Sequence, residues 1–223
     1  MKQLLVFIGK LDKEHEELTK IQIDNSLELG WKVEDIVLVT DFEWEYRGVK
    51  ALVLKGNFDA LDGNRSSKIP VINRLFDMGK VRDGDTYWFH DHDAFQLEPM
   101  EQPKINELGI TNHGWSGKWN AGSFFFNRSS VDTFQQIYSS MLDNATNEQD
   151  ALTSLIQNFQ VTNYTLLNIT YNLNIYHLEH NLKKAEKPLM VAHFHPHKPR
   201  HLDLFRSILP QRLLTIFNNY GIK

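Results

Sequence analysis

The sequence of 223 residues contains no cysteine, which excludes disulfide bonds, zinc–thiolate sites and cysteine nucleophiles. No stretch approaches the ~18 consecutive apolar residues of a membrane-spanning helix. The apolar run near the N-terminus, MKQLLVFIGK, is too short for the core of a signal peptide, and charged residues follow it at once. From these absences we expect a cytoplasmic protein without a membrane span.

The chain also lacks the excess of positive charge that is typical of nucleic-acid-binding proteins. Its formal net charge is -4 and its pI is about 6.2, so nucleic acid is not an expected partner. Hydrophobic residues make up 41% and charged residues 23%, which is an ordinary globular composition. Because domains of ~200–250 residues are common and no linker or repeat is visible, we predict one domain over residues 1–223.

Apolar runs and amphipathic segments alternate over residues 1–95. Short β-branched runs predict buried strands, and longer mixed segments with helical spacing predict helices. The expected strands are residues 4–9, 35–41, 51–54 and 86–89, and the expected helices are residues 12–29 and 67–79. This alternation predicts an α/β fold with a mostly parallel central sheet flanked by helices, and a Rossmann-like N-terminal half.

The pattern over residues 96–223 is more mixed. Strands are expected at residues 123–126, 164–175 and 189–195, and helices at residues 131–142 and 148–158, with a helical tail over 203–219 that Pro210 interrupts.

Polar residues follow three of the predicted strands in the first half. Ligands of parallel sheets bind beyond the carboxyl ends of the strands, so we expect these residues to meet at one crevice. They are Gly9 with Lys10, Thr40 with Asp41, and Asp91 with Asp93.

The strongest local signal is the triplet Asp91-His92-Asp93, directly after a predicted strand. Two carboxylates one residue apart both reach one hard cation if the backbone turns there. Without a cation, the two acids would repel each other. A solvated acidic turn is the alternative, and it would be the preferred interpretation if the triplet stood alone.

Three further segments carry residues suited to ligand binding. The segment HFHPHKPRH at residues 193–201 offers imidazoles for a metal and cations for phosphate, although an exposed basic loop would have the same composition. Glycines flank Trp119-Asn120-Ala121, which indicates a close backbone approach. The run Glu148-Gln149-Asp150 would by itself be interpreted as a helix cap.

Taken in order, these segments resemble the GT-A glycosyltransferases, and among them the family of glycogenin and the bacterial lipopolysaccharide galactosyltransferases. That family shows a strand ending in D-x-D, then N-A-G, a D-Q-D-like helix start, and H-F/Y followed by K-P-W. The counterparts here are Asp91-His92-Asp93, Asn120-Ala121-Gly122, Glu148-Gln149-Asp150, and His193-Phe194 with Lys198-Pro199. Residues 1–95 would then be the nucleotide-binding half, and residues 96–223 the half that binds donor sugar and acceptor.

The resemblance implies a metal-dependent glycosyltransferase whose donor is a nucleotide-sugar of the UDP type. The acceptor would be a glycan or another hydroxyl compound, and the transfer would retain the configuration of the anomeric carbon. Asp91, Asp93 and His193 would hold Mn²⁺ or Mg²⁺, which would stabilise charge on the departing nucleoside diphosphate. Asp91 would also contact the ribose, and Lys198 would add a cation near the phosphates.

The remaining roles that the resemblance implies concern the donor. Gln149 and Asp150 are the expected catalytic residues, with Gln149 on the reactive face of the donor and Asp150 on its sugar hydroxyls. Asn120 and Gly122 would also hold the sugar, and Asp41 would bind the base or ribose. The other expected donor-binding residues are Gly9, Thr40, Arg65 and Lys68.

The sequence departs from the family pattern in ways that leave alternatives open. His92 stands where a small residue is usual, Arg200 replaces the usual Trp, and the spacing from His193 to Lys198 is one residue short. His195 therefore remains an alternative metal ligand.

Other functions fit parts of the pattern. A nucleotidyltransferase that makes a nucleotide-sugar would use a similar sheet, but with a Gly-rich basic loop where this chain has IGKLDKEH. A metal-dependent hydrolase would use the His and Asp clusters without a nucleotide, and a binding module would keep the fold without catalysis.

Overall fold

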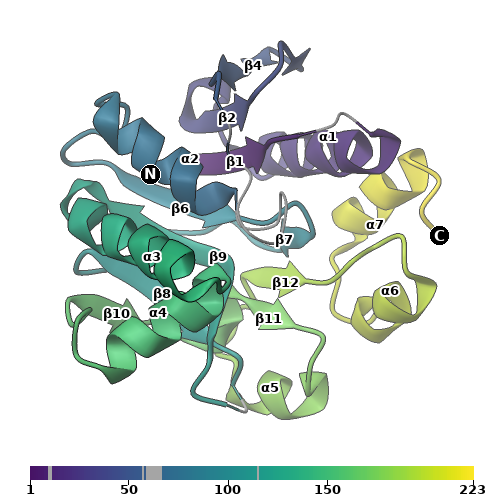
Figure 1. Ribbon diagram of the computed structural model, residues 1–223. Coiled ribbons are helices and arrows are strands. Elements are labelled where there is room, and N and C mark those ends of the chain that lie inside the picture. The colour runs from purple at the N-terminus through teal and green to yellow at the C-terminus, as the bar shows by residue number, and fades with distance from the viewer. Residues whose placement is uncertain (10–11, 57, 59–66, 115) are drawn as a thin grey trace.

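The computed structural model describes residues 1–9, 12–56, 58, 67–114 and 116–223. Its centre is a seven-stranded sheet in the order β10-β8-β9-β6-β1-β2-β5 (Figure 1). All neighbouring strands pair in parallel except β9, which runs antiparallel to β6 and β8. The strands are β1 (Lys2–Phe7), β2 (Ile36–Thr40), β5 (Leu52–Val53), β6 (Thr86–His90), β8 (Leu108–Asn112), β9 (Trp119–Asn127) and β10 (Tyr164–Leu166). The predicted α/β class with a mostly parallel sheet is confirmed.

Helices cover both faces of this sheet. Successive side chains of a strand point to opposite sides, and the central strands carry apolar residues on both sides. In β1, Leu4 packs into the core under α2, α3 and α4, whereas Leu5 packs with Ile23 of α1 on the other face. A strand buried on both faces is a continuous apolar run, which is why β1 was recognisable. The helices are α1 (Lys13–Glu28), α2 (Lys68–Asp77), α3 (Val131–Asn144), α4 (Glu148–Gln157), α5 (Leu178–Lys184), α6 (Pro199–Phe205) and α7 (Gln211–Asn219).

A second, three-stranded sheet brings the C-terminal third against the first half of the chain. Its order is β11-β12-β7, with β12 parallel to β11 and antiparallel to β7. The strands are β7 (Ala94–Gln96), β11 (Leu173–Asn174) and β12 (Val191–His193). A separate hairpin is formed by β3 (Glu45–Tyr46) and β4 (Val49–Lys50).

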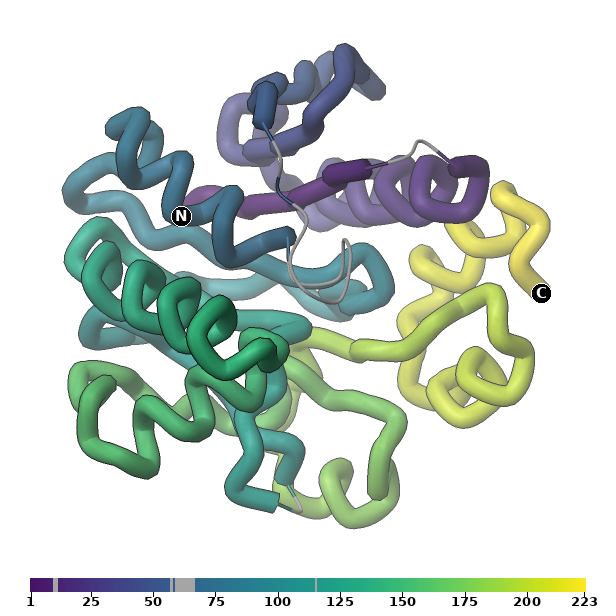
Figure 2. Tube along the Cα trace, in the orientation of Figure 1, coloured from purple at the N-terminus to yellow at the C-terminus, as the bar shows by residue number. Residues whose placement is uncertain are grey.

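The C-terminal helix α7 lies beside α1 (Figure 2). The hydroxyl of Tyr220 donates to Asp24 over 2.8 Å, and the guanidinium of Arg212 donates to Asn25 over 3.2 Å. The last residues of the chain are thereby tied to the first helix. No helix in the described part of the chain combines the length and apolarity needed to cross a membrane.

The second half differs from expectation in detail. The single strand expected at residues 164–175 is broken into β10 and β11 by a 3-10 turn, because the Asn168 side chain accepts from the N–H of Thr170 over 3.0 Å. The tail is two helices, α6 and α7, separated at Pro210. β9 begins at Trp119, earlier than predicted, and β7, β8 and α5 were not predicted.

Candidate active site

The triplet Asp91-His92-Asp93 follows β6 at its carboxyl end, near the middle of the large sheet. It lies on a cavity of about 880 Å³ that is lined by residues of β1, α1, the start of α2, the start of α4 and the segment after β12. A cavity is therefore present at the carboxyl end of β6, where part of the ligand crevice was predicted.

Asp91, Asp93 and His193 each bring one ligand atom to within 4.8 Å of the other two. Asp93 Oδ1 lies 3.2 Å from His193 Nε2. Two carboxylate oxygens and one imidazole nitrogen form a donor set that fits Mn²⁺ or Mg²⁺. His195, the alternative ligand, instead places its Nε2 2.9 Å from Glu14 Oε1. The geometry favours His193.

The charges of Asp91, Asp93 and His193 shift one another's pKa values. Burial raises the pKa of Asp91, against the opposing effect of the Lys68 ammonium. Burial acts in the same direction on Asp93, but the charge of His193, its hydrogen bond to Asp93 and the charge of His195 together outweigh burial and lower the pKa of Asp93. Burial alone would lower the pKa of His193, yet Asp93 raises it. The cluster is thus a compact set of opposite charges in a half-buried place at the cavity.

Lys68 is a buried cation that joins three parts of the site. Its Nζ lies 2.8 Å from Asp91 Oδ1 and 3.2 Å from Glu148 Oε1, and it donates to the carbonyl of Ala121 over 3.3 Å. Burial disfavours the charge, but the two carboxylates outweigh it and raise the pKa of Lys68. The start of α2 is therefore fastened to the loop after β6, to α4 and to β9.

Glu148 is a site residue that sequence reasoning passed over in favour of Asp150. Glu148 lines the cavity, whereas Asp150 is 41% exposed and pairs with Lys118 at 2.6 Å. Asn147 caps α4 by accepting from the N–H of Asp150 over 3.0 Å. The helix phase set by this cap decides which of the two acids faces inward.

An irregularity in β9 organises the site. Pairing between β8 and β9 shifts between Ile110 and Thr111, so the residues between Asn120 and Phe124 have no partner on β8. All four carbonyls of residues 120–123 accept hydrogen bonds from side chains or backbone of the site. The donors are Lys68 to Ala121, the N–H of Asp91 to Gly122 (2.8 Å), and the Asn172 amide to Asn120 and Ser123.

Gly122 lies against the imidazole of His193, and a Cβ at this position would overlap the ring. We expect Gly122→Ala to displace His193, to lower the free energy of unfolding by about 1–3 kcal/mol and to weaken Mn²⁺ binding. Thermal unfolding and Mn²⁺ titration measure the two effects. Gly117→Ala is the matched control, since a Cβ there meets no atom of the described residues within 4 Å. Unchanged Mn²⁺ affinity in Gly122→Ala would contradict the expected contact.

The other predicted residues divide between this cavity and its surroundings. Gln149 and Lys198 line the cavity. Gly9 and Asp41 meet at the ends of β1 and β2, where the Gly9 N–H donates to Asp41 over 3.1 Å. Thr40 beside them is buried and donates to the carbonyl of Phe42. These three residues do not belong to the cavity lining, and Lys10 and Arg65 lie outside the described residues.

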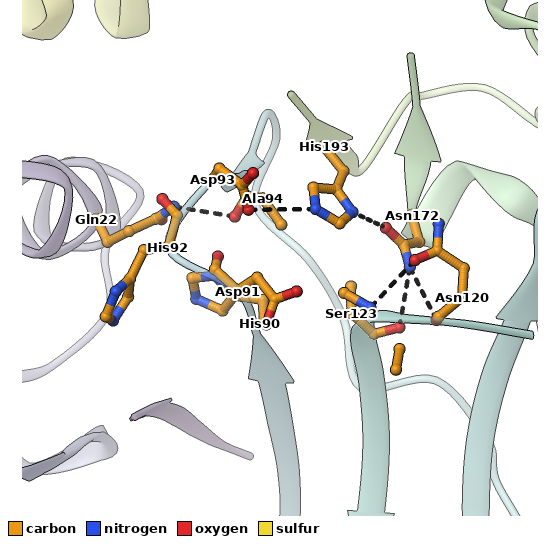
Figure 3. A network of polar contacts seen from close by, with 12 residues as sticks. Gln22, His90, Asp91, His92, Asp93, Ala94, Asn120, Ser123, Asn172 and His193 are labelled. Atoms are coloured by element: carbon orange, nitrogen blue, oxygen red, sulfur yellow. Dashed lines mark hydrogen bonds and ion pairs between the residues drawn. The ribbon is translucent and has the colours of Figure 1, made fainter. Parts of the chain in front are cut away.

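His92 points away from the other two members of its triplet (Figure 3). Its ring meets Phe7 edge-on at 5.7 Å between centroids, and burial lowers the pKa of His92 to about 4. The backbone carbonyl of His92 accepts from the Gln22 amide over 2.7 Å. This hydrogen bond connects α1 to the loop that carries Asp91 and Asp93.

Comparison with known proteins identifies the fold of the chain. No protein-family model matches the chain, and no curated protein matches it. Several solved structures, in contrast, match the chain. The galactosyltransferase LgtC, in complex with donor and acceptor sugar analogues, is 13% identical with a TM-score of 0.58 over 98% of this chain and 96% of its own. The chain has the GT-A fold. The resemblance drawn from the four motifs is confirmed at the level of the fold.

Two further glycosyltransferases share this GT-A fold. GlyE of Streptococcus pneumoniae TIGR4 is 13% identical with a TM-score of 0.58, and the match covers 100% of this chain but only 64% of GlyE. A glycosyltransferase involved in glycosylation of the major capsid of PBCV-1 is 11% identical with a TM-score of 0.55, over 86% of this chain and 93% of its own. The GT-A chain described here is thus close in extent to LgtC and the PBCV-1 enzyme.

Proposed function

We propose that the protein is a metal-dependent glycosyltransferase. Its donor is a nucleotide-sugar of the UDP type, and the sugar is transferred to a hydroxyl group of a glycan or other acceptor. The observation that carries this proposal is the meeting of Asp91, Asp93 and His193 at an open cavity flanked by Lys68 and Lys198. Two acids and an imidazole suit a divalent cation, and the ammonium group of Lys198 suits phosphates.

The chemistry divides between the cation and the chain. When bound by Asp91, Asp93 and His193, Mn²⁺ or Mg²⁺ supplies positive charge that stabilises the leaving nucleoside diphosphate. Lys198 adds a second cation at the same cavity. Lys68 holds Asp91 in place through its 2.8 Å contact, so that the carboxylate is oriented before any ligand arrives.

Retention is supported by the residues on the α4 side of the cavity. An inverting transfer needs a free general base to take the proton of the acceptor hydroxyl. Gln149 is neutral, and its Oε1 accepts from the N–H of Ala121 over 3.4 Å. The neighbouring acid, Glu148, is ion-paired with Lys68 at 3.2 Å. A side chain such as Gln149 is suited to orient the donor sugar rather than to remove a proton.

Calorimetric titration of UDP, with and without Mn²⁺, tests the proposal. We expect UDP binding that depends on Mn²⁺, and slow Mn²⁺-dependent release of UDP from the matching UDP-sugar. UDP binding that ignores Mn²⁺ would contradict the proposal. Pyrophosphate release from a nucleoside triphosphate and a sugar phosphate would instead identify a nucleotidyltransferase. Metal-dependent turnover of a simple ester without a nucleotide would identify a hydrolase.

A further inference from the structure

Asn172 contacts His193, the third expected metal ligand, on the side of the imidazole ring that faces away from Asp93 (Figure 3). It is fully buried and stands just before β11. Its Oδ1 is 3.0 Å from His193 Nδ1. Its Nδ2 is 3.1 Å from the carbonyl oxygen of Asn120 and 3.5 Å from that of Ser123. One side chain therefore contacts both the imidazole and the irregular segment of β9.

The orientation of the Asn172 amide follows from its partners. Backbone carbonyls only accept hydrogen bonds, so the NH₂ group must face Asn120 and Ser123. The opposite orientation would place Oδ1 against two carbonyl oxygens. Oδ1 therefore faces His193, and because Oδ1 only accepts, the Nδ1 of His193 carries a hydrogen. The two carbonyl contacts therefore fix the orientation of the amide.

The consequence for His193 is that Nε2 is left as the ligand atom. Nε2 is also the nitrogen near Asp93, at 3.2 Å. Partners on the far nitrogen of a metal-binding imidazole set its tautomer, its orientation and its basicity. His195 has no such support from the described residues, among which its buried Nδ1 has no hydrogen-bond partner. The contact with Asn172 thus separates the two candidate histidines.

We propose that Asn172 is a positioning residue that commits His193 to binding a divalent cation through Nε2. The same amide links that commitment to the backbone of residues 120–123, so the metal ligand and the segment expected to hold the donor sugar are aligned by one side chain. The inference rests on the proposed function for its metal, and it adds a residue that none of the four sequence motifs contains.

The test uses Mn²⁺ alone, measured by calorimetry and by pulsed electron paramagnetic resonance on the full chain. We expect Asn172→Ala to weaken Mn²⁺ binding by about 10–100-fold and to diminish the nitrogen hyperfine coupling of a bound imidazole. Asn181→Ala is the matched control. Asn181 is equally buried, and its amide donates to the carbonyls of His113 and Tyr176 at 3.0 and 2.9 Å, but it is not part of the metal-ligand group.

A second variant separates positioning from general loosening. Asn172→Asp keeps an acceptor for Nδ1–H but loses both donors to β9, so it is expected to lower the unfolding midpoint while it binds Mn²⁺ more tightly than Asn172→Ala. Unchanged Mn²⁺ affinity in Asn172→Ala, or equal losses in Asn172→Ala and Asn181→Ala, would overturn this inference alone. A wild-type chain that binds no Mn²⁺ would overturn the proposed function and this inference with it.

Discussion

Asp93→Ala is expected to abolish measurable Mn²⁺ binding, with a loss of more than about 100-fold, and to remove the Mn²⁺-dependent part of UDP binding. The substitution deletes one of three ligand groups and leaves His193 without the carboxylate at 3.2 Å that raises its pKa. The loss should exceed the 10–100-fold that is typical when only a supporting hydrogen bond to a ligand is removed. Calorimetry with Mn²⁺ alone, and then with UDP, measures both effects.

His92→Ala is the control for Asp93→Ala, because it alters the same loop without touching the ligands. The His92 ring packs against Phe7, so its removal should cost some stability while Mn²⁺ affinity stays within a few-fold of wild type. The reverse pattern, with binding abolished in His92→Ala and spared in Asp93→Ala, would show that the triplet has been assigned wrongly even though the fold is correct.

Lys68→Met is expected to lower the free energy of unfolding by roughly 3–5 kcal/mol, the usual result of removing one partner of a buried ion pair. The Lys68 side chain is only 6% exposed and lies between Asp91 and Glu148. Methionine retains a flexible apolar stem over the ring of Phe89, where Nζ lies 5.1 Å from the centroid. The loss therefore reports the removal of the ammonium group from beside two carboxylates, and denaturant titration measures it.

Two further variants isolate the charge effect at Lys68. Adding Glu148→Gln to Lys68→Met should recover part of the lost stability, since one of the two carboxylates that faced the ammonium group becomes neutral. Lys118→Met removes a lysine of a surface pair, in which Lys118 is 48% exposed beside Asp150, and should change stability by no more than about 1 kcal/mol. A Lys68→Met variant as stable as Lys118→Met would disprove a structural role for the buried cation.

The sheet and the place of Asp91 and Asp93 were predictable because strands buried on both faces are continuous apolar runs, and polar residues after them must lie at one edge. β7 escaped prediction for the opposite reason. It comprises three residues, Ala94–Gln96, too few to show a period. Without β7 there was no way to foresee the pairing of Ala94 with His193, and the meeting of the ligands rested on the order of the motifs.

Glu148 and Asn172 show what a linear pattern leaves open. The resemblance to the family favoured Asp150 in the Glu148-Gln149-Asp150 run, but the phase of α4 turns Glu148 toward the cavity. Asn172 lay inside a stretch that alternated like one strand, so nothing marked it. Its contact with His193 depends on β11 and β12 lying side by side, which is a tertiary property.

The short β7–β12 pairing has a consequence for how the molecule comes apart. Asp93 precedes β7 and His193 ends β12, so a cation shared between them would close a ring of about 100 residues, and closing long rings is the usual task of a disulfide bond. This chain has no cysteine for that purpose. A divalent ion at the site would act as a reversible cross-link between the first half and the C-terminal third. Chelation would then remove this cross-link, and the contact between β7 and β12 would be the first to be destabilised.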